Sequence, residues 1–126
     1  MAQQTAHLEA RSIDSPDEVR PFEDGMGQVD VVTLSDGILV LRQTFRPGWR
    51  WSSHVKPITG TDRCEADHIG YVLSGRMTIR MEDGDEISMG RGDVFHIPPG
   101  HDAWVDGDED CVAIDFGGSV EYAKRH

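Results

Sequence analysis

Three histidines and one cysteine have the clearest capacity for chemistry in this chain: His54, His68, His101 and Cys64. Neutral imidazole is the commonest protein ligand of metal ions, and three imidazoles around an open position suit zinc, iron, manganese, nickel or copper. Zinc also accepts thiolate beside imidazole, and Cys64 precedes His68 by four residues, which places both on one face of a regular strand. These four residues predict a divalent metal site, with zinc as the first choice of ion.

Each of these residues also has a simpler interpretation. A single histidine is more often a packed or surface residue than a ligand, and Cys64 can equally be a half-buried loop thiol. Asp115 follows Cys111 and Ala113 at two-residue spacing, so it is either a hydrogen-bond partner for a ligand histidine or an exposed strand carboxylate. The spacing alone leaves these alternatives open.

The segment Gly92–Trp104, GDVFHIPPGHDAW, contains the sharpest break among the elements that must position these side chains. Proline has no N–H group to donate to a sheet, and glycine adopts backbone angles that other residues avoid. We expect a strand that ends near Ile97, a bend through Pro98–Gly100, and a new strand that starts near His101. The bend would hold His101 at a defined point.

Short strands separated by turn residues are expected over most of the chain. Glycine occurs 14 times, and turn signals recur about every 8 to 12 residues, which favours an antiparallel sandwich or barrel. Two of the expected strands, 49–55 and 64–73, carry candidate ligands. We expect an all-β domain over residues 28–118, an N-terminal extension over 1–27 and a C-terminal tail over 119–126.

Composition narrows the classes of partner. The chain has 126 residues and a net charge of −11, and a surface this acidic repels phosphate backbones, so no nucleic acid is expected. No apolar run reaches the roughly 20 residues of a membrane span, and no signal segment is apparent, so we expect a cytoplasmic protein that does not associate with membranes. Two cysteines do not make a disulfide framework in a chain of this size.

Two glycine-bounded frames resemble the two motifs of the cupin superfamily. Gly92, five residues, Pro98, one residue and Gly100 match the second motif, and Gly48 followed after five residues by His54 resembles the first. His68 lies seven residues before Gly75, where the family places a glutamate ligand. The resemblance implies a cupin-type double-stranded β-helix, a jelly-roll barrel of antiparallel strands that often holds a divalent metal.

The chain departs from the family pattern at several ligand positions. Lys56 stands where the first motif usually has its second histidine, and Ala103 stands where the second motif has its histidine. His101 lies two residues before Ala103 and therefore faces the same side of a strand. The first motif also contains a longer insertion, 57–67, which includes Cys64. The metal set that remains is His54, His68 and His101, with Cys64 as a fourth candidate.

The resemblance implies a metal-binding protein whose barrel cavity also holds a small molecule. A three-histidine metal with open positions is compatible with an oxygenase, an isomerase or a lyase, and no residue selects among them. The alternative is a non-catalytic small-molecule-binding or sensor module without metal, which the missing ligands favour. Cupin-like barrels commonly pair, so a homodimer is also expected.

Overall fold

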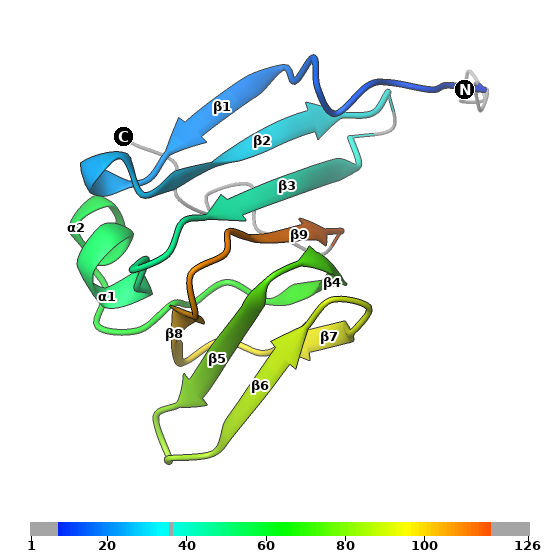
Figure 1. Cartoon of the computed structure of the whole chain (residues 1–126). Helices are drawn as coiled ribbons and strands as arrows, with labels where there is room; N and C mark the ends of the chain where they lie inside the picture. The colour runs from blue at the N-terminus through cyan, green and yellow to red at the C-terminus, as the bar shows by residue number, and fades with distance from the viewer. Residues whose placement is uncertain (1–7, 36, 117–126) are drawn as a thin grey trace, which may run out of the picture.

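The computed structural model describes residues 8–35 and 37–116, which form two antiparallel sheets (Figure 1). The larger sheet has six strands in the order β1-β2-β3-β9-β4-β7, and the smaller has three in the order β6-β5-β8. The strands are β1 (Glu18–Pro21), β2 (Gly27–Thr33), β3 (Leu39–Phe45), β4 (His68–Ser74), β5 (Arg76–Met81), β6 (Glu86–Gly90), β7 (Val94–Ile97), β8 (His101–Asp106) and β9 (Cys111–Asp115).

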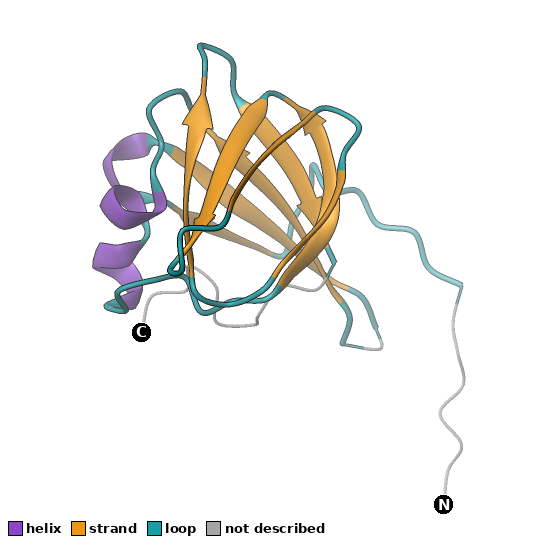
Figure 2. Cartoon of the chain, turned by 90° about the horizontal axis from the view of Figure 1, so that it is seen from below, coloured by secondary structure: helices purple, strands orange, loops and turns teal. Residues whose placement is uncertain are grey.

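Alternating burial along the strands explains why the two sheets close on each other. In β4 the odd positions Ile69, Tyr71 and Leu73 are exposed, whereas His68, Gly70 and Val72 are buried. This two-residue period turns one face of the sheet inward and the other toward solvent. The inward faces of both sheets share one hydrophobic core. Figure 2 shows how the strands curve around it into a barrel. The predicted all-β jelly-roll barrel is confirmed.

The expected strand over residues 49–55 is wrong. Two short helices, α1 (Trp51–His54) and α2 (Lys56–Thr59), occupy this region and lie at one side of the barrel (Figure 2). Trp51 and Val55 are both buried and are four residues apart, the spacing of one helix face. Pro57 lies in the first turn of α2, where its missing N–H costs nothing. The four-residue spacing was the sequence signal for helix.

The sheet also begins earlier than the expected boundary at residue 28. Strand β1 pairs with β2 along its whole length, from Glu18 opposite Val31 to Pro21 opposite Gln28. A short 3-10 helix, η1 (Glu23–Gly25), connects the two strands. Part of the expected N-terminal extension therefore belongs to the barrel, while the expected tail, 119–126, lies outside the described residues.

The predicted bend is confirmed at both ends. Strand β7 ends at Ile97, and β8 begins at His101. Because β7 belongs to the larger sheet and β8 to the smaller, the Pro-Pro-Gly segment carries the chain from one sheet to the other. Among the described residues, no helix has the length and apolar composition needed to cross a membrane.

Candidate metal centre

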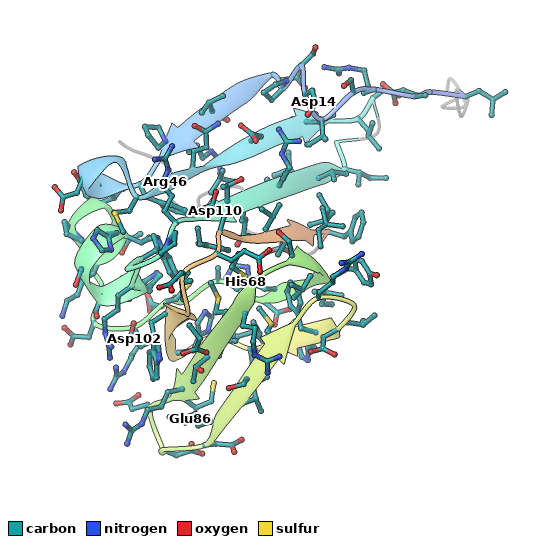
Figure 3. All side chains as sticks on the ribbon, in the orientation of Figure 1. Asp14, Arg46, His68, Glu86, Asp102 and Asp110 are labelled. Carbon is teal, nitrogen blue, oxygen red and sulfur yellow. The ribbon has the colours of Figure 1, made fainter. Side chains whose placement is uncertain are left out.

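Three of the four predicted ligands meet inside the barrel. Candidate ligand atoms of Cys64, His68 and His101 all lie within 4.8 Å of one another. The three residues are 3%, 5% and 3% exposed, so the cluster is buried, and Figure 3 shows His68 in the middle of the molecule. His68 comes from the larger sheet and His101 from the smaller, and their ring centroids are 5.4 Å apart. The cluster thus spans the space between the two sheets.

Backbone hydrogen bonds hold Cys64 against the bend. The Cys64 N–H donates to the His101 carbonyl at 2.8 Å, and the Gly100 N–H donates to the Cys64 carbonyl at 2.7 Å. Gly100 has φ of 99°, a conformation that favours glycine. The insertion that carries Cys64 therefore runs beside the bend that carries His101, which explains how residues far apart in sequence come together.

Both imidazoles are oriented through their Nδ1 atoms. The Nδ1 of His101 lies 2.8 Å from the Pro98 carbonyl oxygen. A carbonyl can only accept a hydrogen bond, so this nitrogen carries the proton. The Nδ1 of His68 bonds in the same way to the carboxylate of Asp115. When each ring is neutral, this arrangement leaves the lone pair on Nε2, the atom that a metal ion would bind.

Asp115 is a buried partner of His68 and not an exposed strand carboxylate. Its side chain is 0% exposed. The Gln43 amide donates to Oδ2 at 2.9 Å, and the Ile69 N–H donates to Oδ1 at 3.4 Å. Several donors thus satisfy a carboxylate that would otherwise be costly to bury. Of the two alternatives for Asp115 in the sequence, the structure selects the hydrogen-bond partner.

The cluster changes the protonation of its members. Burial raises the pKa of the Cys64 thiol, but hydrogen bonds and charge interactions with His101 and His68 outweigh burial and bring that pKa from 9.0 down to about 6. Burial lowers the pKa of His68, whereas hydrogen bonds to Asp115 and Cys64 raise it, with a result of about 9. The two opposite shifts favour a thiolate at Cys64 and a proton on His68, and a cation bound to the cluster would compete with that proton.

The arrangement of donors fits a small divalent ion. For tetrahedral zinc with Zn–S near 2.3 Å and Zn–N near 2.0 Å, the sulfur and nitrogen ligands are about 3.5 Å apart. The Cys64 Sγ and His68 Nε2 atoms are 3.6 Å apart. One thiolate and two imidazoles also suit the intermediate softness of zinc, and three protein ligands leave a fourth position open. The donor types and the Cys64–His68 separation therefore fit zinc, and the candidate ligand atoms of all three residues lie within 4.8 Å of one another.

His54, the fourth predicted ligand, lies elsewhere. It ends α1, where its Nδ1 accepts a hydrogen bond from the Arg50 N–H at 3.0 Å and its Nε2 is 4.0 Å from Asp24 Oδ2. Lys56, which follows in α2, extends to Asp62, with 3.5 Å between the Lys56 Nζ and Asp62 Oδ1 atoms. The two short helices that replace the expected strand thus place His54 outside the cluster and direct Lys56 toward Asp62.

A small cavity of about 30 Å³ adjoins the two histidines. Its walls combine aromatic, aliphatic and methionine side chains from both sheets with His68, His101 and Gln43. Trp49 and Trp51 line it as well. The volume suffices for one or two water molecules or for the head of a small ligand.

Several solved structures share the fold. An uncharacterised conserved protein with a double-stranded β-helix domain from Klebsiella pneumoniae is 22% identical, with 92% of this chain and 93% of that chain covered and a TM-score of 0.58. KdgF from Halomonas sp. is 24% identical, with 75% and 81% covered and a TM-score of 0.51. The oxalate decarboxylase formate complex from Lactobacillus farciminis is 16% identical, with a TM-score of 0.53; the match covers 77% of this chain and 30% of that one.

Sequence comparison gives the family. No curated protein matches the chain. The family model described as "Cupin domain" matches residues 51–117, more than half of the chain and the part that contains all three clustered residues. With the jelly-roll barrel and the two glycine frames, this match shows that the chain belongs to the cupin family.

Proposed function

We propose that this protein is a metal-binding cupin in which Cys64, His68 and His101 hold a zinc ion beside the barrel cavity, and in which the cavity receives a small molecule. The observation that carries the proposal is the anchoring of both imidazoles through Nδ1, to Asp115 and to the Pro98 carbonyl. Such outer partners are typical of metal-binding histidines, because they fix the ring and the tautomer.

The residues of the chain have distinct roles in this proposal. Cys64 supplies a negative charge, and the two histidines supply neutral donors, so the three ligands leave a zinc site with one net positive charge. Asp115 orients His68 and makes it a better donor. A bound zinc ion with an open position would supply Lewis-acid chemistry to a ligand in the cavity. Oxygenase chemistry is less well matched, because zinc has no redox activity, whereas lyase or isomerase chemistry needs only a Lewis acid.

Zinc titration of the purified chain tests the proposal. After treatment with a chelator, we expect the protein to bind one zinc ion in competition with a chromophoric chelator. The variants Cys64→Ser and His101→Ala should lose most of this affinity. His54→Ala is the matched control, because it removes an imidazole that lies outside the cluster, and it should bind zinc as the wild type does.

Failure of zinc, iron, manganese, nickel and copper alike to bind would refute the proposal. The same holds if His54→Ala weakens binding as much as His101→Ala does, because the cluster would then not be the site. In the first case the metal-free ligand-binding or sensor module, the alternative derived from the sequence, becomes the better account.

The expected homodimer stays a proposal, and one surface supports it. Three exposed side chains lie on the paired strands β4 and β7: Ile69 (47% exposed) and Tyr71 (41%) on β4, and Val94 (78%) on β7. Tyr71 lies opposite Val94 in the sheet. Uncharged apolar side chains of this kind are common at the centre of interfaces between identical subunits. Light scattering should give twice the monomer mass for the wild type and the monomer mass for Val94→Lys; a wild-type monomer would contradict the proposal.

A further inference from the structure

The cavity beside the two histidines has a wall that is almost entirely apolar. Among the described residues that line it, all except Gln43, His68 and His101 have aromatic, aliphatic or methionine side chains. This described lining contains no aspartate, glutamate, lysine or arginine. Burial of a charged or unpaired polar group against such a wall is costly, whereas burial of an apolar group is favourable. The composition of the wall therefore favours an uncharged, apolar occupant.

The three polar residues of the wall have donors that are engaged with the protein itself. The Gln43 amide donates to Asp115 Oδ2 at 2.9 Å, and His68 Nδ1 bonds to the same carboxylate. His101 Nδ1 donates to the Pro98 carbonyl at 2.8 Å. The Nε2 atoms of the two rings are those that the proposed metal ion would bind. Because a buried water molecule needs about two to four polar partners, this wall is poorly suited to hold water or a polar head group.

We infer that the cavity binds an uncharged alkyl group of about two carbon atoms. The small molecule of the proposed function then turns a short aliphatic end, and not a charged or polar head, toward His68 and His101. The inference rests on the proposed function, because it assigns a chemical class to the ligand that the cavity receives there. It deepens that function by adding the property for which the wall selects.

The size of the cavity sets the length of the alkyl group. A volume of about 30 Å³ has room for about two groups of the size of a water molecule or a methyl group. Each carbon group that leaves water for this wall should strengthen binding about fourfold, so two should strengthen it about 15-fold. A hydroxyl in place of one methyl would lose its partners in water, and binding should weaken about tenfold or more.

Ethane and methanol are the probes for the test, because each has two heavy atoms and only methanol has a hydroxyl group. The protein carries ¹³C in its methionine methyl groups, and it is studied both zinc-loaded and after treatment with a chelator. Met77 and Met89 line the cavity, whereas Met81 lines a separate hollow and Met26 packs against the core elsewhere. We expect ethane to shift the Met77 and Met89 methyl resonances with one saturating dependence and to leave those of Met26 and Met81 in place. Methanol should bind about tenfold more weakly or worse.

A pair of variants tests whether the cavity is the site. Ala113 lines the cavity, and Ala113→Val adds two methyl groups to its wall, so ethane should bind about tenfold more weakly or not at all. Ala66 is also buried, at 8% exposed, but it is not among the described residues that line the cavity. Ala66→Val is therefore the matched control and should bind ethane within about twofold of the wild type. If Ala113→Val does not fold, the comparison of ethane with methanol in the wild type decides.

The outcomes separate this inference from the proposed function. The inference is overturned if ethane gives no saturable shift at Met77 and Met89, if methanol binds as tightly, or if Met26 and Met81 shift equally; none of these results touches the metal site. If the zinc titration shows no binding, the proposed function fails, and the ethane titration of chelator-treated protein still decides what the cavity accepts. Saturation by ethane at Met77 and Met89 alone, with weaker binding in Ala113→Val, supports the inference.

Discussion

Asp115→Asn is the most informative single substitution, because it changes the partner of a ligand without touching a ligand. The carboxylate accepts from His68 Nδ1 and Gln43 Nε2 on one oxygen and from the Ile69 N–H on the other. An asparagine amide has the same shape but replaces one oxygen by an NH₂ group. In either orientation this NH₂ group faces at least one N–H donor, and the negative charge beside His68 is lost.

The size of the effect follows from these contacts. One buried donor left against another donor costs about 1–3 kcal/mol of unfolding free energy. If the NH₂ group faces His68 Nδ1, the imidazole is driven to place its proton on Nε2, the nitrogen that the metal needs. Loss of an outer partner typically costs about 10–100-fold in metal affinity. We therefore expect Asp115→Asn to bind zinc about 10–100 times more weakly than the wild type and to unfold at lower urea concentration.

Asp30→Asn is the matched control for this experiment. Asp30 is also buried, at 3% exposed, but it accepts from Arg42 at 3.0 Å and from Gln28 at 2.7 Å, away from the cavity. It should lose stability and retain zinc affinity. Zinc competition titrations and urea unfolding of both variants give the two quantities. Equal zinc affinity in Asp115→Asn and the wild type would refute the role assigned to Asp115.

Two further predictions concern the thiols and the turns. The pKa of Cys64 is lowered to about 6, so in metal-free protein the thiolate absorbance near 240 nm should appear with a midpoint near pH 6 and be absent in Cys64→Ser. Burial raises the pKa of Cys111 to about 12, so this thiol should add no thiolate absorbance below pH 10. A midpoint above pH 8 would contradict the assignment of the thiolate to Cys64. Gly75→Ala should lower the free energy of unfolding, measured with urea, by about 2 kcal/mol or more. The reason is that φ at this position is +77° and the new Cβ would lie 2.4 Å from the Asp110 carbonyl oxygen. Gly84→Ala, with φ of +95° and open space, should lose less, and equal losses would show that the contact with Asp110 does not matter.

The fold could be predicted because its signals are local. The Pro-Pro-Gly bend set the ends of two strands at Ile97 and His101, and the structure has the same ends. The argument that His101 and Ala103 share a face also holds, since both are buried and both line the cavity. Proline and glycine act on their own segment of backbone, so their effect can be derived without tertiary contacts.

The candidate site could be predicted only in part, because it depends on contacts between distant segments. His54 was predicted as a ligand from its place after Gly48 in the first motif, whereas the structure places it at the end of α1, outside the group of Cys64, His68 and His101. Cys64 and His68 do meet, but Cys64 lies outside β4 and reaches the cluster through its pairing with His101. No sequence pattern indicates that pairing, since it joins an insertion to a bend in another sheet.

The cluster draws its members from three separate pieces of the chain: an inserted loop, the larger sheet and the smaller sheet. An ion held there would act as a removable cross-link across the barrel, comparable to a disulfide but governed by free ion concentration. Binding to the native state alone raises its stability by about 2.7 kcal/mol when the free ion reaches 100 times its dissociation constant. The free energy of unfolding of this barrel would then depend on the concentration of free metal ion, so a measurement of unfolding would show whether the site is occupied.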